Sequence, residues 1–272
     1  MKTKSYHIFY RYEKPEILEW AEKIRQKLSA FEQTDHDPEL VIVLGGDGGI
    51  LEAARKYTSS FIVGFNFGTK GFLASAHNEK EYEAAIAKIL SGDFQVSERK
   101  MIDVSASREG QEFFRECALN DGVVNSLVGV VELNVSIDGE PYQIVRGSGV
   151  MVATATGSTA YNLSAHGPIV VPELPAMIVT ELLDHDVPTP SVVVPSKSTI
   201  GIKVVKFRQT DRLKLSKTNE PADVVLDIDG AHLVALQPGD EITVTESDRT
   251  TKLLEFEDNY FLKNIQRLFT FR

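Results

Sequence analysis

Cysteine is almost absent from this sequence, whose 272 residues include a single one, Cys117. One cysteine cannot form an intramolecular disulfide, so a reducing compartment is the simpler expectation. Cys117 stands in a run of strand-forming residues from 113 to 119, which predicts a small buried thiol and not a catalytic nucleophile.

Long apolar runs are also missing. No stretch approaches the ~18 apolar residues that a membrane-spanning helix requires, and the N-terminus lacks the continuous apolar segment of a secretion signal. We therefore expect a cytoplasmic protein with no membrane partner.

Basic runs are missing too, because 39 acidic residues outnumber 29 Lys and Arg and give a net charge of −10. Long-range repulsion disfavours nucleic acid as a partner. A phosphate site must therefore be built locally, from backbone N–H groups, a helix N-terminus, a bound metal or a few placed cations.

What is present is the composition of an ordinary folded protein, with 42% hydrophobic and 25% charged residues, at a length that suits two domains. After about residue 92, short strand-like runs separated by turn residues predict a second, strand-dominated domain. Apolar residues at helical spacing from 259 to 269 predict a helix that packs back on one of the domains. Before residue 92 the pattern alternates in a way typical of βαβ units and a mostly parallel sheet, with strands at 6–10, 40–44 and 61–65 and helices at 16–31, 50–57 and 79–90.

The strongest local feature is a strand from 41 to 44 that runs directly into Gly45-Gly46-Asp47-Gly48-Gly49 and then into a helical pattern. Glycines let backbone amides face a ligand, and the helix N-terminus that follows favours phosphate. The spacing matches neither the P-loop nor the dinucleotide-binding fingerprint. A carboxylate beside phosphate is repelled unless it holds a metal or accepts the proton of an attacking hydroxyl, which suggests a base at Asp47. A cap for the following helix explains Asp47 equally well.

A second constellation covers residues 153–168, where small hydroxyl residues surround Gly157 and precede Tyr161. Such a surface can hydrogen-bond a ribose or a base and stack against it. Taken alone, the segment is better explained as a capped helix with Ser158 as the cap and Tyr161 in the core.

Together these segments resemble the NAD kinase family. Four motifs appear in the family's order between positions 45 and 168. They are Gly-Gly-Asp-Gly at 45–48, the Asn-x-Gly-x-x-Gly-Phe-Leu pattern at Asn66, Gly68, Gly71, Phe72 and Leu73, the Asn-Glu pair as Asn120-Asp121, and Thr-Gly-Ser-Thr-Ala-Tyr at 156–161 followed by Ser164 and Gly167-Pro168.

The resemblance implies an α/β nucleotide-binding domain with a parallel, Rossmann-like sheet over residues 1–98. An all-β, sandwich-like domain that binds NAD would follow over 99–250, and a C-terminal segment, 251–272, would return to the first domain. It further implies an enzyme that phosphorylates the 2′-hydroxyl of the adenosine ribose of NAD, with ATP or polyphosphate as donor. Mg²⁺ would be held mainly through the donor phosphates and not by a protein metal site, and the chain would form a homodimer or homotetramer.

The resemblance also assigns residues. Asp47 is implied as the general base. The implied binding residues are Gly46 and Gly48 at the phosphates, Asn120 and Asp121 at ribose hydroxyls or the adenine edge, Thr156, Ser158, Thr159, Ala160 and Tyr161 around the adenosine, and Phe72, Arg146, Ser148 and Ser164 elsewhere in the nucleotide site.

Several positions depart from the family pattern. Asp121 is one methylene shorter than the usual Glu, Gly49 replaces a Thr, Ser148 replaces an Asp, and Lys70 replaces a Leu. Arg146 offers forked donors to phosphate but could instead pair with an acidic neighbour.

Two acidic residues near the C-terminal end of the β-rich region allow two interpretations. Asp227 and Asp229 could approach the ribose or a metal, although a hairpin turn at Asp229-Gly230 is favoured.

The rival functions are a lipid or sphingoid kinase, which shares the Gly-Gly-Asp-Gly loop, and a non-catalytic dinucleotide sensor.

Overall fold

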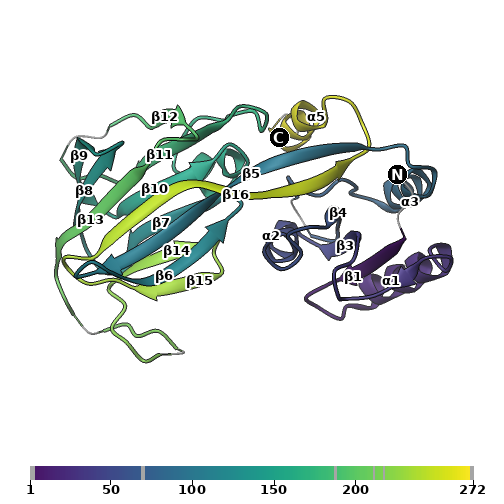
Figure 1. The fold of residues 1–272 in the computed structure, drawn as a ribbon, viewed down its shortest axis with the longest axis horizontal. Coiled ribbons are helices and arrows are strands. Elements are labelled where there is room, and N and C mark those ends of the chain that lie inside the picture. The colour runs from purple at the N-terminus through teal and green to yellow at the C-terminus, as the bar shows by residue number, and fades with distance from the viewer. Residues whose placement is uncertain (1–3, 69–70, 187–188, 211, 217, 270–272) are drawn as a thin grey trace. The chain divides into compact units, whose positions relative to one another are not determined.

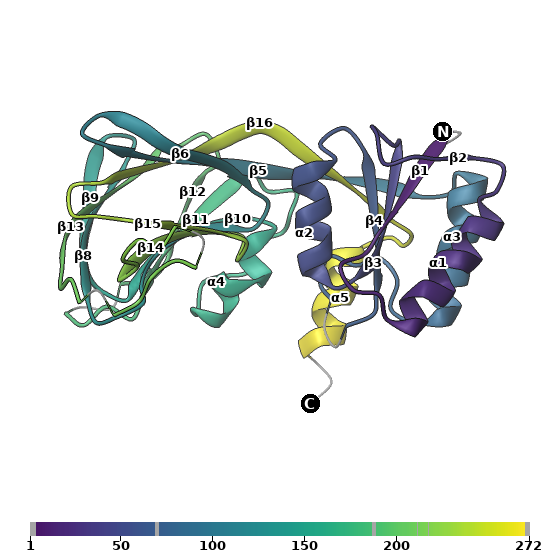
Figure 2. The ribbon, with the colours of Figure 1, turned by 90° about the horizontal axis from the view of Figure 1, so that it is seen from below.

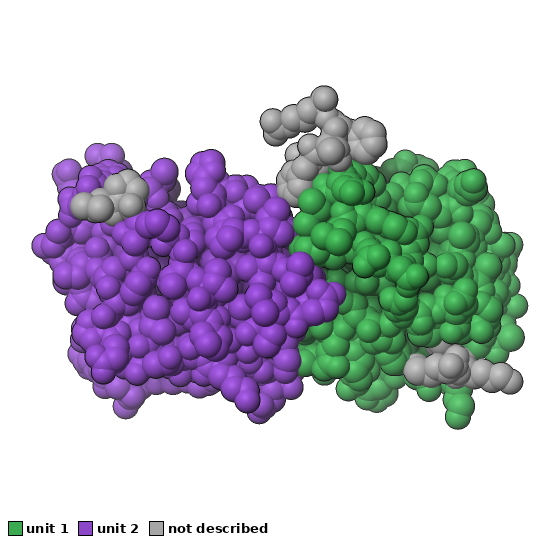
Figure 3. Space-filling model, turned by 90° about the horizontal axis from the view of Figure 1, so that it is seen from above, with its two compact units in different colours: residues 1–99, 250–272 green, residues 100–249 purple. Residues whose placement is uncertain are grey.

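The computed structural model describes residues 4–68, 71–186, 189–210, 212–216 and 218–269. The chain divides into two compact units, one formed by residues 1–99 and 250–272 and the other by residues 100–249 (Figure 3). Strands β5 (Gln95–Arg108) and β16 (Glu241–Glu255) carry the chain from one unit to the other. Lys70 lies outside the described residues.

The first unit is an α/β structure around parallel strands in the order β2-β1-β3-β4, and residues 252 and 253 of β16 extend it in parallel beside β4. Its strands are β1 (Ser5–Phe9), β2 (Glu32–Gln33), β3 (Leu40–Gly45) and β4 (Phe61–Asn66). Its helices are α1 (Pro15–Lys27), α2 (Asp47–Lys56), α3 (Glu79–Ser91) and α5 (Tyr260–Phe269). Figure 2 shows α1 and α3 on one side of these strands and α2 and α5 on the other.

Local sequence explains these helices. Helix α1 begins with Pro15 and buries Ile17, Trp20 and Ile24 at helical spacing against the sheet. Helix α3 begins at a cap where the Asn78 side chain accepts a hydrogen bond from the amide of Glu81, and it ends at a left-handed glycine.

The second unit contains two layers of antiparallel strands (Figure 1). One layer has the order β12-β11-β10-β7-β14-β15, and the other contains β5, β6, β8, β9, β13 and β16. Side chains from both layers, such as Val152 of β10 and Ile202 of β13, form one buried core. The elements of this unit not yet bounded are β6 (Gln111–Ala118), β7 (Asp121–Ser126), β8 (Val131–Ile137), β9 (Glu140–Gly147), β10 (Gly149–Thr154), the 3₁₀ turn η1 (Gly157–Thr159), α4 (Tyr161–Ser164), β11 (Ala176–Leu182), β12 (Val192–Pro195), β13 (Ile200–Phe207), β14 (Val224–Ile228) and β15 (His232–Ala235).

This architecture confirms the fold class expected from the sequence, an α/β domain with parallel strands followed by a β-rich domain. The C-terminal helix belongs to the first unit. One boundary differs in a way that matters for the site: α2 begins at Asp47, three residues earlier than the apolar pattern predicts. Glycine and aspartate carry no apolar signal, so periodicity alone cannot detect this first turn. Within the described part of the chain, no helix is long and apolar enough to cross a membrane.

Candidate active site

The glycine loop joins strand β3 to helix α2 in the first unit. Residues 40–44 are all buried, Gly46 is extended with φ −107° and ψ −175°, and α2 starts at the next residue. A Cβ added to Gly45 or Gly46 would meet nothing within 4 Å, so the backbone here faces open space. A Cβ on Gly49 would lie 3.1 Å from Cγ1 of Val43, which shows how closely α2 begins against the strand. The loop therefore offers an accessible backbone at a helix N-terminus, as a phosphate requires.

The carboxylate of Asp47 does not cap its own helix. Its Oδ2 accepts a hydrogen bond from the amide of Phe72 at 2.8 Å, and its Oδ1 accepts one from the amide of Leu73 at 3.0 Å. Burial raises the pKa of Asp47, while the backbone donors at 72–74 and the positive charge of Arg267 lower it. The acid is thus held in one orientation by a second loop, which follows β4.

A cation that the sequence did not single out lies beside the glycine loop. Arg11 follows β1, and its Nη1 is 3.1 Å from where a Cβ on Gly48 would stand. Its Nε pairs with the Glu52 carboxylate at 2.5 Å. Arg11, Tyr10 and the loop glycines line a cleft of about 210 Å³. The position of Arg11 in the sequence could have identified it, because a residue just after a parallel strand lies at the carboxyl edge of the sheet.

Phe72 is the aromatic residue that the resemblance places in the nucleotide site. It is half-buried, and its ring meets that of Phe261 edge-on with 5.5 Å between centroids. Its amide holds Asp47, so Phe72 and the predicted base are brought together in the first unit.

In the second unit, Asn120 and Asp121 stand at the start of β7 beside the end of β14. The carboxylate of Asp229 accepts hydrogen bonds from the amides of Leu119, Asn120 and Asp121 at 3.0, 2.8 and 3.1 Å. Asp229 and Gly230 have φ of +51° and +66° in the β14–β15 hairpin, so the favoured turn interpretation is right. The turn has a second role as well, because it fixes the Asn120-Asp121 backbone.

Acidic side chains are crowded around Asp121, which is 6% exposed. Burial and the neighbouring charges of Asp229 and Asp227 raise the pKa of Asp121 to about 8. One carboxylate oxygen of Asp227 is buried without a hydrogen-bond partner, and burial raises the pKa of this acid too. Among the described residues, no group of three or more His, Cys, Asp and Glu side chains is arranged to hold a metal ion. Because its pKa is raised to about 8, Asp121 is largely protonated near neutral pH and can donate a hydrogen bond.

The turn at 154–160 packs directly on Asn120. A Cβ on Gly157 would lie 2.1 Å from the Asn120 carbonyl oxygen, so only glycine allows this approach. The Thr154 hydroxyl donates to the carbonyl of Leu119 at 2.6 Å and accepts from the amide of Gly157 at 2.9 Å. The Asn-Asp pair and the Thr/Ser/Tyr segment predicted from the sequence therefore lie together.

Ser158 needs a different interpretation from the one that the resemblance implies. The residue is completely buried, and its hydroxyl donates to the carbonyl of Ala155 at 2.6 Å, lies 3.1 Å from the carbonyl of Val170 and accepts from the amide of Val170 at 3.0 Å. Because these backbone groups occupy the hydroxyl, Ser158 stabilises the turn and presents no surface to a ligand in this structure.

The remaining residues of the segment differ in exposure. Thr156 is buried, Thr159 and Ala160 are half-buried, and Ser164 is exposed. Tyr161 is 46% exposed, so it is not the core residue that a capped helix requires. Its ring is available for stacking.

Asn162 is a structural residue that no sequence pattern singled out. It is fully buried, and its amide nitrogen donates to the carbonyls of Ser158 and Pro168 at 3.2 and 3.0 Å. Its Oδ1 accepts from the Thr180 hydroxyl at 2.8 Å. These bonds tie the segment to β11. A buried asparagine carries no periodic signal that would mark it beforehand.

Arg146 and Ser148 lie near the β9–β10 connection. The Arg146 guanidinium pairs with Glu132 on the neighbouring strand and with Asp186, each at 2.8 Å. The structure therefore shows the pairing alternative for Arg146. Ser148 is half-buried, and its amide and carbonyl join β11 and β7 through Leu182 and Ser126.

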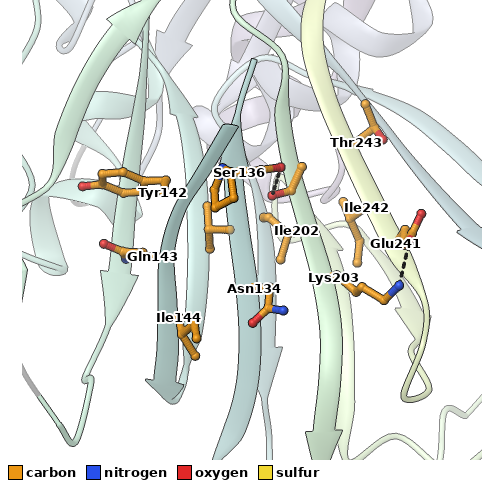
Figure 4. A pocket seen from close by; sticks show the side chains of 13 residues that line it. Asn134, Ser136, Tyr142, Gln143, Ile144, Ile202, Lys203, Glu241, Ile242 and Thr243 are labelled. Carbon is orange, nitrogen blue, oxygen red and sulfur yellow. Dashed lines mark hydrogen bonds and ion pairs between the residues drawn. The ribbon is translucent and has the colours of Figure 1, made fainter. Parts of the chain in front are cut away.

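A separate pocket of about 570 Å³ lies over strands β8, β9, β13 and β16 (Figure 4). Its polar side chains include Lys203 and Glu241, which pair with each other at 2.8 Å. None of the residues assigned by the resemblance lines this pocket. We therefore place the candidate active site at the glycine loop and the Asn120–Ser164 region, each within its own unit.

Comparisons with known proteins match both the N-terminal and the C-terminal part of the chain. Residues 1–94 match the model of the ATP-NAD kinase N-terminal domain, and residues 116–256 match that of the ATP-NAD kinase C-terminal domain. An NAD kinase of Lachnoclostridium phytofermentans is 33% identical over 239 residues, which cover 86% of this chain and 80% of the relative. An NAD kinase of Syntrophobacter fumaroxidans is 36% identical over 235 residues, covering 84% and 78%.

A solved structure shares the fold of this chain. Yeast NADH kinase complexed with NADH superposes with a TM-score of 0.84 at 22% identity, covering all of this chain and 89% of that one. At that identity the likeness shows the fold alone, whereas the family models and the curated relatives show descent. Because both domain models match and curated NAD kinases are more than 30% identical over most of the chain, the chain belongs to the NAD kinase family.

Proposed function

We propose that this protein, as an NAD kinase, transfers a phosphoryl group to the 2′-hydroxyl of the adenosine ribose of NAD with Asp47 as the general base. The observation that carries the assignment is the carboxylate of Asp47, which two backbone amides hold at the accessible end of β3. Each oxygen accepts one amide hydrogen and keeps further acceptor capacity for a hydroxyl proton. Burial raises the pKa of Asp47 and so strengthens it as a base.

The donor would lie along the glycine loop. The amides of Gly46 and Gly48 and the N-terminus of α2 supply the partial positive charge that phosphate oxygens require. Arg11, beside Gly48, adds a guanidinium at the mouth of the cleft. These groups suit ATP or polyphosphate equally.

Mg²⁺ would enter with the donor. The described part of the chain contains no group of three or more His, Cys, Asp and Glu side chains that is arranged to hold a metal ion. We propose that Mg²⁺ is bound by the donor's phosphate oxygens, where it would neutralise the charge that develops during transfer.

The second unit would hold the adenosine. Asn120 and a protonated Asp121 can hydrogen-bond ribose hydroxyls, and the exposed ring of Tyr161 can stack on the base. Thr156, Thr159, Ala160, Ser164 and Ser148 would complete the surface in the second unit. Phe72, in the first unit, would be a further contact of the nucleotide. Ser158 is left out, because backbone groups engage its hydroxyl. Arg146 is left out, because two carboxylates hold its guanidinium, whereas Arg11 has one such partner among the described residues.

Two solved structures that share the fold support the choice of these ligands. The yeast enzyme is complexed with NADH, and an NAD kinase from Archaeoglobus fulgidus is in complex with ATP. We propose NAD and a nucleoside triphosphate or polyphosphate as substrates here. A cytoplasmic location and a homodimer or homotetramer complete the proposal, as the family resemblance implies.

The test is an NADP-forming assay with purified protein, NAD, Mg²⁺ and either ATP or polyphosphate. Asp47→Asn should lower kcat by roughly 10²- to 10⁴-fold, because the base is lost. Binding of NAD should change little. Asp93→Asn, which neutralises an acid after α3 and outside the site, is the matched control and should keep full activity.

Each rival function has its own outcome in the same assay. Full activity in Asp47→Asn would overturn the base assignment. Binding of NAD by the unaltered protein without NADP formation would indicate a dinucleotide sensor, and phosphorylation of diacylglycerol instead of NAD would indicate a lipid kinase.

A further inference from the structure

The loop that holds Asp47 is itself held from its other side. Its amides at Phe72 and Leu73 donate to Asp47, while its carbonyls accept hydrogen bonds from helix α5. Arg267 Nη2 donates to the Gly71 carbonyl at 3.1 Å, and Asn264 Nδ2 donates to the Phe72 carbonyl at 3.0 Å. The loop 71–74 therefore lies between the acid and the helix.

A third bond completes the contact. The Tyr260 hydroxyl donates to the carbonyl of Ala74 and also meets Nε2 of His77 at 3.2 Å. Residues 260, 264 and 267 are spaced four and three apart, so they share one face of α5. Tyr260 and Asn264 are 9% and 3% exposed, so two of these three donors are buried.

We propose that Tyr260, Asn264 and Arg267 of α5 are positioning residues that hold the carboxylate of Asp47 through loop 71–74. The inference rests on the proposed role of Asp47 as the base. Transfer rates depend steeply on the placement of reacting groups, so a looser loop reduces kcat even though α5 touches no substrate. None of the three residues belongs to a motif of the family resemblance.

Charge gives Arg267 a second effect on Asp47. Arg267 and Tyr260 on α5 interact electrostatically with Asp47. His77 after the loop meets the Tyr260 hydroxyl, and Arg11, paired with Glu52, lies beside Gly48. Burial and the charge of Arg267 lower the pKa of His77 to about 4, so His77 is neutral at working pH.

The sign of the pH response follows from these charges. Arg267 lowers the pKa of Asp47, so removing its charge raises that pKa. The ionised form of Asp47 is the active base. The acid limb of the kcat profile should therefore move to higher pH when the charge is removed.

The experiment compares Arg267→Gln, Arg267→Lys and Lys263→Gln in the full chain. Lys263 is the matched control, because it is an exposed cation on the same helix and pairs with Glu257 at 2.7 Å, away from the loop. We expect Arg267→Gln to shift the acid limb to higher pH. Arg267→Lys, which keeps the charge, should stay at the wild-type position, and Lys263→Gln should change nothing.

A second variant tests positioning without charge. Asn264→Ala should lower kcat by roughly tenfold while the KM values for NAD and the donor stay within about twofold. Should this buried substitution prevent folding, the Arg267 series decides the question, because Arg267 is only half-buried.

The outcomes separate this inference from the function itself. If Asp47→Asn is inactive, the positioning role is overturned by a wild-type kcat in Asn264→Ala, or by a profile of Arg267→Gln that superposes on the wild-type profile in both height and position. Full activity in Asp47→Asn overturns the proposed base, whatever the α5 variants do.

Discussion

Substitution of Asn162 by Ala would remove the side-chain hydrogen bonds that hold the 156–164 segment in place. The side-chain amide makes three hydrogen bonds in a fully buried place, to the carbonyls of Ser158 and Pro168 and from the hydroxyl of Thr180. A buried hydrogen bond contributes about 1 kcal/mol net, and the cavity left by the side chain adds about 1 kcal/mol. We expect the free energy of unfolding of the second unit to fall by about 3 to 4 kcal/mol.

Gly167 packs closely against the Asn162 side chain. A Cβ on Gly167 would lie 2.0 Å from Oδ1 of Asn162, so the chain is already packed against this side chain. For a unit of this size, about 3 to 4 kcal/mol corresponds to a loss in Tm of roughly 6 to 16 °C. The KM for NAD should rise as well, because the exposed Tyr161 precedes Asn162 on the same turn.

The assay is thermal unfolding followed by circular dichroism, together with steady-state kinetics below the transition. Asn162→Asp keeps the shape but loses both amide hydrogens, so it should destabilise at least as much as Ala. Asn134→Ala, at an exposed position of β8, is the control and should leave Tm within about 1 °C. A Tm for Asn162→Ala equal to that of the wild type would refute the reasoning.

Two further predictions follow from single side chains. Because the folded pKa of Asp121 is raised to about 8, the folded state binds this proton more tightly than the unfolded chain, so the free energy of unfolding should decline as pH rises through the neutral range. Asp121→Asn should flatten that decline, and identical slopes of Tm against pH in variant and wild type would contradict it. Arg11→Gln should raise the KM for the donor by about tenfold, the lower end for a charged hydrogen bond, because Glu52 already engages the guanidinium. The KM for NAD should not change, and an unaltered donor KM would remove Arg11 from the phosphate site.

The sequence predicts the parts of this structure that depend on short-range pattern. The strand at 41–44 and the glycine loop after it are recognisable because burial requires a continuous apolar run and a close backbone requires glycine. The reason for Gly157 is not of this kind, since the carbonyl that leaves no room for a Cβ belongs to Asn120, far away along the chain.

The roles of hydroxyl and cationic residues are predicted less well, because the residue type does not reveal which groups the side chain contacts in the fold. Ser158 and Thr159 are adjacent and chemically alike, yet the first is fully buried among backbone groups and the second is half-buried. Judged by residue type alone, Arg146 and Arg11 could both bind phosphate. Cross-strand pairing directs Arg146 to Glu132, while the end of β1 places Arg11 beside the glycine loop.

The contact between α5 and the loop is hardest to predict, for a physical reason. The reacting group must be a carboxylate on a glycine turn, so chemistry restricts the residue type and leaves a motif. The groups that hold loop 71–74 need only donate hydrogen bonds to carbonyls, which Tyr260, Asn264 and Arg267 do with three different side chains. Many combinations can meet that requirement, and the partners lie more than 180 residues apart along the chain. The structure therefore locates the support of the proposed base where no motif marks it, and the pH dependence of kcat is the property that reports whether that support acts on Asp47.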